Sequence, residues 1–535
     1  MLSYRKLAMR VLGHPLHTGG IDSPRPASQR AAAFILTAAM LTTLAAPAFA
    51  DIWHIENGDI TISAGESGNN VTQNNNTTYG DTNTIITNQN KDTASSHTVT
   101  IEAKDKDDKV EVTLKDVNID TSSRNKAAVS VTGEGDTNIK LDGDNALKSD
   151  IYRSGIYGSG SGSLTISGGE NDSLTAQGGS GANGISSSGS LTISGGTVTA
   201  NGDDGGRGIS SSGSVTISGG STVTANGGSG TISGGDGICS SGGVTISGGS
   251  TVTANGGNGG SLVGGDGIRS DGGVTISGGT VKAAGGDSKD GYGGDGIRSG
   301  GGVTISGNTV NAAGGNGGKV GGYGICSFDR VAISGGTVEA AGGNGSTGGG
   351  SGIYSSVIDL SGSLELTAKA GSPNGKALSQ KGSELVLDTI KDKLGPGAKV
   401  TATDADGKVI DQVSTPRPVE PEESSSSSDG GSAAPSAPAS PLPGLTVTDK
   451  DGQRISYTST QSGNTLTVCV GRLTASFRIS LAALRQLRAE GIETIAFQTV
   501  LCSTTLSVDE LLAIGGENAE AVLTHRFTDS SLTVG

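Results

Sequence analysis

The sequence predicts a right-handed, single-stranded parallel β-helix followed by a small α/β domain at the C-terminus. The β-helix is predicted first by repetition, because isoleucines that precede a Ser-Gly pair recur every 24 to 30 residues, at Ile193, Ile217, Ile246, Ile276, Ile305 and Ile333. It is predicted also by composition, because 94 glycines separate runs rich in Val, Ile and Thr, while aromatic residues make up only 3%. A change of pattern after residue 444 predicts the second domain.

Each repeat of about 28 residues contains three short strands, written GIxS, VTIS and TVTA. Side chains alternate along a strand, so the isoleucine of GIxS, the valine and isoleucine of VTIS, and the valine and alanine of TVTA are expected to point inward. Equivalent strands of successive coils would pair in parallel ~4.8 Å apart, which stacks like residues in columns. We expect glycine to supply positive φ at the corners, and Asn201, Asn226 and Asn255 to share that left-handed geometry.

The chain divides by pattern into five segments. Residues 1–50 have a basic start, an apolar run and a small-residue cleavage site after Ala50, which predicts a signal peptide and a mature chain that starts at Asp51. Residues 51–96 are predicted to form an N-terminal cap with a polar loop over 65–90, sealed by Trp53. Residues 97–414 form the β-helix, which closes through 360–370 and 397–410. The protein is therefore expected to be secreted or held at the cell surface, with no transmembrane segment in the mature chain.

A Pro/Ser-rich and acidic stretch, residues 415–444, is predicted to be an extended linker. Residues 445–535 then alternate as strands in LTVCV, ASFRIS and TIAFQT, and LAALRQLRAEG has the apolar stripe of a helix that ends at Gly491. TLSVDELLAI repeats the pattern of a strand that leads into a helix. These patterns predict the small α/β module.

Charge and residue counts exclude several classes of function. The net charge of −15 argues against a nucleic-acid partner. Only three histidines lie outside the leader, with no zinc-binding spacing. The runs at 403–408 and 448–453 begin like a calcium loop but lack its distal ligands, so they are predicted to be hairpin turns.

The four cysteines do not predict a disulfide framework. Cys239 and Cys326 share a column three copies apart, ~14 Å at one strand spacing per copy, which is beyond the ~7 Å limit for a disulfide. Cys469 and Cys502 could pair with each other or could both be reduced.

One column of acidic residues is a candidate metal site. Asp236, Asp266 and Asp295 precede the Gly-Ile of successive repeats. Stacked carboxylates ~4.8 Å apart repel one another by ~0.9 kcal/mol per pair even in water. A bridging calcium ion would relieve that repulsion. The alternative is that aspartate before glycine is a favoured turn residue that points into solvent.

Arg269 and Arg298 form the next column. They could pair with Asp266 and Asp295 on the surface, or bind a carboxylate of a glycan. Beside aspartate-bound calcium, arginine could also remove a proton from a uronate, as in polysaccharide lyases.

The outward positions of the second strand form a predicted strip of hydroxyl groups ~24 Å long over six coils. Such a strip could hydrogen-bond a polysaccharide or order water, although threonine also simply suits exposed strands. Its central members are Thr216, Ser218, Thr245, Ser247, Thr275 and Ser277.

The succession DVNIDTS, DTNIKLDGDNALKS and SGSLTISGG, with coils that start in Gly-Ile, resembles the bacterial carbohydrate-binding domain-containing parallel β-helix family over residues 98–367. The resemblance implies a secreted β-helix that binds polysaccharide, acidic glycans included, with calcium. The C-terminal part resembles a small α/β module of bacterial surface proteins. We therefore expect a non-catalytic polysaccharide-binding protein; the alternatives are an adhesin-like stalk that presents the C-terminal module and a calcium-dependent polysaccharide lyase.

Overall fold

The computed structural model describes residues 51–416 and, with short gaps, residues 445–534. The predicted signal peptide and nearly all of the predicted linker lie outside the described residues. The chain divides into two compact units, one on each side of the segment 417–444.

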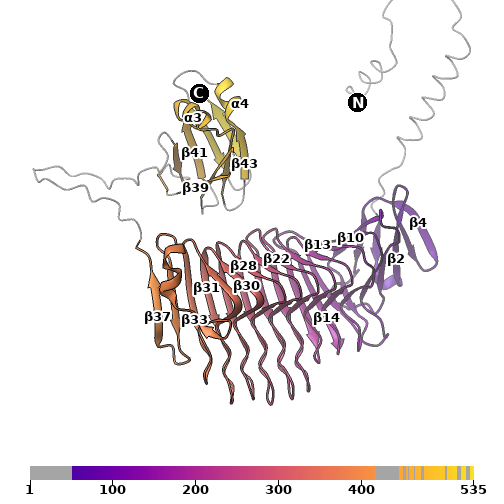
Figure 1. Cartoon of the computed structure of the whole chain (residues 1–535). Coiled ribbons are helices and arrows are strands. Elements are labelled where there is room, and N and C mark those ends of the chain that lie inside the picture. The colour runs from indigo at the N-terminus through magenta and orange to yellow at the C-terminus, as the bar shows by residue number, and fades with distance from the viewer. Residues whose placement is uncertain are drawn as a thin grey trace, which may run out of the picture. The chain divides into compact units, whose positions relative to one another are not determined.

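The first unit is a parallel β-solenoid of about 13 coils (Figure 1), which confirms the predicted fold class. Three strands make up a coil. The first strands of successive coils are β6 (Val99–Ala103), β9 (Val129–Gly133), β12 (Ile156–Gly158), β15 (Ile185–Ser187), β18 (Ile209–Ser211), β21 (Ile238–Ser240), β24 (Ile268–Ser270), β27 (Ile297–Ser299), β30 (Ile325–Ile333), β32 (Ile353–Leu360) and β34 (Leu378–Gln380).

The second strands follow after a short corner, and in the last full coils they merge with the first, in β30 and β32. They are β7 (Lys109–Lys115), β10 (Asp136–Asp142), β13 (Leu164–Ser167), β16 (Leu191–Ile193), β19 (Val215–Ile217), β22 (Val244–Ile246), β25 (Val274–Ile276) and β28 (Val303–Ile305).

The third strands form a separate twelve-stranded sheet, whose twelfth strand, at one edge, is the second strand of the hairpin that ends the solenoid. They are β8 (Asn118–Asp120), β11 (Asp144–Lys148), β14 (Ser173–Ser180), β17 (Thr197–Asp203), β20 (Thr222–Asn226), β23 (Thr251–Asn255), β26 (Thr280–Ala284), β29 (Asn308–Ala313), β31 (Gly336–Ala341), β33 (Leu364–Lys369) and β36 (Lys399–Thr403).

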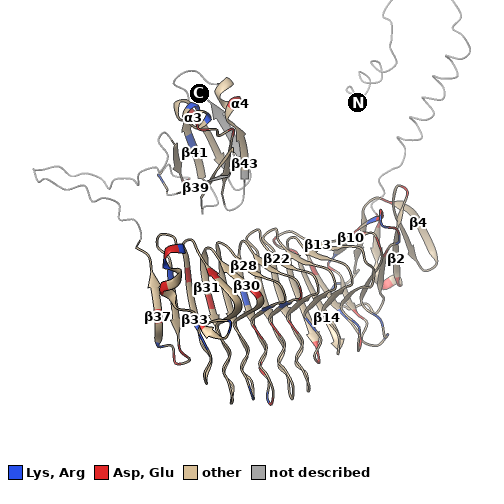
Figure 2. Cartoon of the chain, in the orientation of Figure 1, with Lys and Arg blue, Asp and Glu red and all other residues tan. Residues whose placement is uncertain are grey.

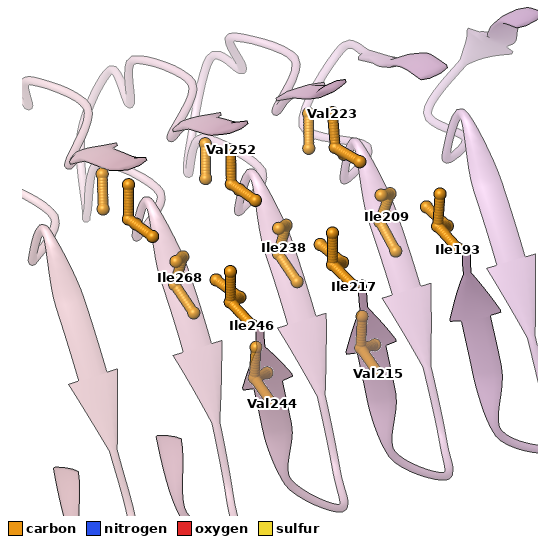
Figure 3. Close-up of a cluster of buried hydrophobic side chains, with 14 of the residues drawn as sticks. Ile193, Ile209, Val215, Ile217, Val223, Ile238, Val244, Ile246, Val252 and Ile268 are labelled. Atoms are coloured by element: carbon orange, nitrogen blue, oxygen red, sulfur yellow. The ribbon is translucent and has the colours of Figure 1, made fainter. Parts of the chain in front are cut away.

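Equivalent residues stack in register, as the repeat predicts. Ile217 pairs with Ile246, and Ile246 pairs with Ile276, and all three are fully buried. Figure 3 shows these ladders of isoleucine and valine inside the solenoid. The alternation also predicted which side chains of the first and third strands point inward, as the burial of Ile238, Val252 and Ala254 confirms.

The ends of the solenoid are covered by local strands. Over residues 65–90, where we expected a polar loop, the chain forms β3 (Gly68–Gln73), β4 (Asn76–Asp81) and β5 (Thr84–Thr87). These join β1 (Ile52–His54), a short 3-10 helix (Ile55–Asn57) and β2 (Ile60–Gly65), which pairs in parallel with β6. Trp53 packs against the core and donates a hydrogen bond to Asp81.

At the other end, β35 (Ser383–Glu384) pairs antiparallel with β34, and a 3-10 helix (Leu387–Lys393) precedes β36. β37 (Val409–Ser414) then folds back on β36 through the hairpin that we predicted at 403–408. Residues 450–452 of the second candidate turn lie outside the described residues; on either side of them, the Asp449 amide donates a hydrogen bond to the Gln453 carbonyl.

Glycine has two different roles, only one of which the sequence predicted. At the corner between the second and third strands, Gly248 and Gly249 have φ of +65° and +73°, as expected. Most other glycines lie in the segments that join the third strand of one coil to the first strand of the next. We call five of these segments the glycine arms; they project as fingers from the coils (Figure 1) and span residues 227–237, 256–267, 285–296, 314–324 and 342–352.

The arms are stacked by hydrogen bonds between glycine backbones. The amide of Gly265 donates to the carbonyl of Gly257 in the same arm, and the amide of Gly286 donates to the carbonyl of Gly265 in the preceding arm, both at 2.8 Å. A Cβ atom on Gly265 would lie 1.9 Å from the carbonyl oxygen of Gly235. These glycines are therefore required by the close approach of neighbouring backbones, and not by positive φ.

The prediction for Asn201, Asn226 and Asn255 was wrong. These residues end β17, β20 and β23 or lie within them, and none of them has positive φ. Their side chains instead stack, since the amide of Asn226 donates to Asn201 and that of Asn255 donates to Asn226, both at 2.8 Å. The asparagines therefore connect successive coils through hydrogen bonds between their side chains.

The second unit contains two four-stranded sheets and two helices. Its core includes Phe477 and Phe497, whose rings lie 5.3 Å apart. The predicted strands and helices are all present, and Gly491, with φ of +89°, follows the first helix as expected. The elements are β38 (Leu445–Thr448), β39 (Thr458–Ser462), β40 (Thr465–Cys469), β41 (Ala475–Ser480), α3 (Leu481–Ala489), β42 (Thr494–Gln498), β43 (Ser503–Ser507), α4 (Val508–Ile514), β44 (Glu520–His525) and β45 (Ser530–Val534).

The packing of the arms predicts the effect of a single added methyl group. Gly265→Ala should lower the free energy of unfolding of the solenoid by about 1–3 kcal/mol or more, because its Cβ would overlap the Gly235 carbonyl. Gly348→Ala is the matched control, since its Cβ would meet only the Val320 methyl groups, at 3.8 Å. Urea unfolding monitored by circular dichroism measures both, and equal stability of the two variants would contradict the proposed packing.

Candidate functional site

A groove runs along the solenoid between the glycine arms and the outer face of the first strands. We call it the arm groove; its volume is about 720 Å³. The arms supply one wall through Val263, Tyr292 and Val320, and they also carry Asp236, Asp266 and Asp295 at their ends. The arginines that line the groove, Arg207, Arg269 and Arg298, come from the coils. Most of the solenoid carries few charges (Figure 2), so this concentration of Asp and Arg side chains is a distinct local feature.

The predicted arginine column lies in this groove. Arg269 of β24 pairs in register with Arg298 of β27, and both line the groove. The column continues to Cys239 on one side and to Cys326 and Tyr354 on the other. The sequence therefore predicted the register of the two arginines correctly.

The predicted aspartate column lines the same groove, but its environment differs from the prediction. Asp236, Asp266 and Asp295 are only 7%, 7% and 4% exposed, so they are not turn residues that point into solvent. Each carboxylate accepts a hydrogen bond from the amide of the equivalent residue in the next coil, at 2.9 Å from Asp266, 2.7 Å from Asp295 and 2.7 Å from Tyr323. The column is thus part of the solenoid's hydrogen bonding.

Arginines neutralise the two ends of this column but not its centre. Arg207 Nε lies 3.2 Å from Asp236 Oδ2, and Arg298 Nη1 lies 3.0 Å from Asp295 Oδ2. Among the described residues, neither Asp266 nor Arg269 has an ion-pair partner. One of the two predicted ion pairs, Arg298 with Asp295, is therefore present. The other predicted pair, Arg269 with Asp266, does not form. The central coil of the groove therefore offers a carboxyl group and a guanidinium group to a ligand.

The electrostatics of the column follow from burial. Burial, and then the neighbouring carboxylates of Asp295 and Asp236, raise the pKa of Asp266 well above its usual value. Burial also raises the pKa of Asp295, although the Tyr323 amide and Arg298 oppose that shift. The in-register stacking of equivalent residues thus places three carboxyl groups side by side, where their negative charges would repel one another.

The cysteines beside the column are thiols at neutral pH. Burial raises the pKa of Cys239 to about 11 and that of Cys326 to about 12. Neither thiol is poised as a nucleophile, because the thiolate is the reactive form. Both are free, as the column spacing predicted, and Cys469 is free as well, while Cys502 lies outside the described residues.

Aromatic side chains at one end of the groove were missed by the sequence analysis. Tyr292 and Tyr323 line the groove, and the ring of Tyr323 stacks on that of Tyr354 with centroids 4.9 Å apart. The Arg298 guanidinium lies 5.2 Å from the centroid of Phe328. The repeat contained a signal for this contact. Tyr323 occupies the position of the aspartates in its coil, and Tyr354 occupies the position of the arginines in the next coil.

The hydroxyl strip forms in register, but on another face. Thr216, Thr245 and Thr275 pair in succession on β19, β22 and β25, with side chains directed outward. None of them lines the arm groove, and neither do Ser218, Ser247 and Ser277, which follow the same strands. The structure therefore brings the predicted aspartates and arginines together and keeps the predicted hydroxyl groups apart from them.

The carboxylates of the aspartate column are already engaged in hydrogen bonds and ion pairs within the solenoid. One oxygen of each carboxylate already accepts a backbone amide, and Asp236 and Asp295 also bond arginine. Among residues 51–416 and the described parts of 445–534, no group of three His, Cys, Asp or Glu side chains could hold a metal ion. Calcium binding by this protein stays a prediction.

Comparison with known proteins adds no family. No protein-family model matches the chain, and searches of curated proteins and of solved structures find no match. Within the described residues, no helix combines the length and apolar character needed to cross a membrane.

The buried column predicts a pH-dependent stability. Because the pKa of Asp266 is raised on folding, its contribution to stability is full below the usual carboxyl pKa and falls as pH rises through the raised value. Asp266→Asn should therefore stabilise the solenoid at pH 7, and the gain should vanish toward pH 4. Asparagine can still accept the amide of the next coil, as Asn183 accepts that of Arg207 at 2.8 Å.

Thermal unfolding across this pH range measures the effect. Asp271→Asn, at an exposed position in the same coil, is the matched control and should change little. A variant Asp266→Asn that is less stable than the wild type at pH 7 would show that the ionised carboxylate stabilises the column.

Proposed function

We propose that this protein is secreted or displayed at the cell surface, and that it binds polysaccharide in the arm groove without cleaving it. The observation that supports this most is the combination of groups along one groove: the Arg269 guanidinium and the Asp266 carboxyl group, neither of which has an ion-pair partner within the described residues, and tyrosine rings. Sugars offer hydroxyl or carboxylate groups to such polar side chains, and their apolar faces pack on aromatic rings.

The location of the protein in this proposal comes from the leader sequence, which is typical of export. The resemblance to carbohydrate-binding β-helix proteins supports the same class of ligand. The proposal assigns binding to the arm groove and not to the hydroxyl strip, since the groove is a hollow whose lining groups can contact a sugar from several sides.

Removal of one groove cation tests the assignment. Arg269→Ala should weaken binding of a polysaccharide at least about tenfold, because charge-assisted hydrogen bonds contribute about 1.5–3 kcal/mol. Lys282→Ala, which removes an exposed cation from the third-strand face, should leave the affinity unchanged. A panel of polygalacturonate, xylan and chitin, measured by calorimetry or pull-down, supplies the ligand.

Other outcomes of the same panel would contradict the proposal. Loss of binding in Thr245→Val with Thr275→Val, but not in Arg269→Ala, would move the site to the hydroxyl strip. Binding by residues 445–535 alone would favour the stalk, and ultraviolet absorbance of an unsaturated uronate would show lyase activity. Binding that EDTA abolishes would show that calcium takes part.

A further inference from the structure

The arm groove is the last of three hollows that follow one another along the solenoid. A second hollow, of about 230 Å³, shares Gly181 and Asn183 with it. A third, of about 300 Å³, shares Arg153 and Tyr157 with the second. Each hollow borders on the next through common lining residues, so the three form one path, which we call the trough.

The trough runs beside a column of outward side chains on the first strands, of which Thr100, Ser130, Tyr157, Ser186, Arg269 and Arg298 line it. Thr100, Ser130, Tyr157, Ser186, Ser210, Cys239, Arg269, Arg298, Cys326 and Tyr354 pair in succession. Each step advances one strand spacing, so Thr100 and Cys326 lie ~38 Å apart. The trough is therefore straight and much longer than a single sugar needs.

Groups suited to sugars lie near both ends of this path. Tyr157 is 44% exposed and lines the second and third hollows, whereas Tyr323 lies ~29 Å farther along, six coils away. Arg153 and Arg269 also line the trough, and neither has an ion-pair partner among the described residues. The segment between them is lined by Ser186, by glycine backbone and by the ion pair of Arg207 with Asp236.

We propose that the trough binds one linear polysaccharide chain lengthwise, with sugars in contact with Tyr157 at one end and with Tyr323 at the other. This inference rests on the proposed function and adds that a single chain must span about six coils for full affinity. A short oligosaccharide would occupy only one hollow, and a branched or globular ligand would not follow a straight column. Linking contacts along one chain raises affinity without any new type of contact.

The test uses the full chain and a size ladder of oligosaccharides made from whichever polymer binds in the panel of polygalacturonate, xylan and chitin. Affinity should rise with oligosaccharide length and level off once the chain spans the distance from Tyr157 to Tyr323. Tyr157→Ala should weaken binding of the polymer about tenfold and leave binding of the shortest oligosaccharide that fits the arm groove unchanged. Tyr323→Ala should weaken binding of both.

Tyr79→Ala is the matched control, because Tyr79 is 77% exposed on the cap and lines none of the three hollows. It should change neither affinity, and circular dichroism should show that all three variants fold. Polymer binding that is insensitive to Tyr157→Ala, or affinity that is independent of length, would overturn the trough and leave the proposed function standing. If the wild type binds no polymer at all, the proposed function itself fails.

Discussion

The advance of one strand spacing per coil is the constraint on which the structure depends. Because each strand hydrogen-bonds in register to its equivalent in the next coil, a position in the repeat has the same environment in every copy. This explains the columns of isoleucine and valine, for which no aromatic core is needed. It also explains why glycine occupies the same positions in successive arms, since each arm lies against the backbone of its neighbours.

The same constraint sets the chemistry of the groove. Register places aspartates of consecutive coils next to one another, and their burial would be costly without the amides and arginines that bond them. The central coil keeps the least satisfied pair of groups, Asp266 and Arg269. Under the proposed function, the same carboxylates would connect neighbouring coils through hydrogen bonds and line the surface that a ligand meets.

The features that follow from the repeat length could be predicted from the sequence. The fold, the inward positions, and the columns of Asp236 and Arg269 could be predicted because the repeat itself shows which residues are equivalent. The glycine arms could not, since backbone contacts between glycines leave no side-chain pattern that distinguishes them from corners. The burial of the aspartates and the meeting of Tyr323 with Tyr354 depend on how the arms fold over the first strands, which spacing alone does not show.

The near identity of residues 264–286 and 293–315 has a genetic consequence. Recombination between such copies would add or delete a whole coil, and the solenoid would accept the change because each coil contacts only its neighbours. One duplication would move Tyr157 and Tyr323 apart by ~4.8 Å. If the trough binds a polymer as proposed, the number of coils would set the length of polymer that it spans, without any change to an individual contact.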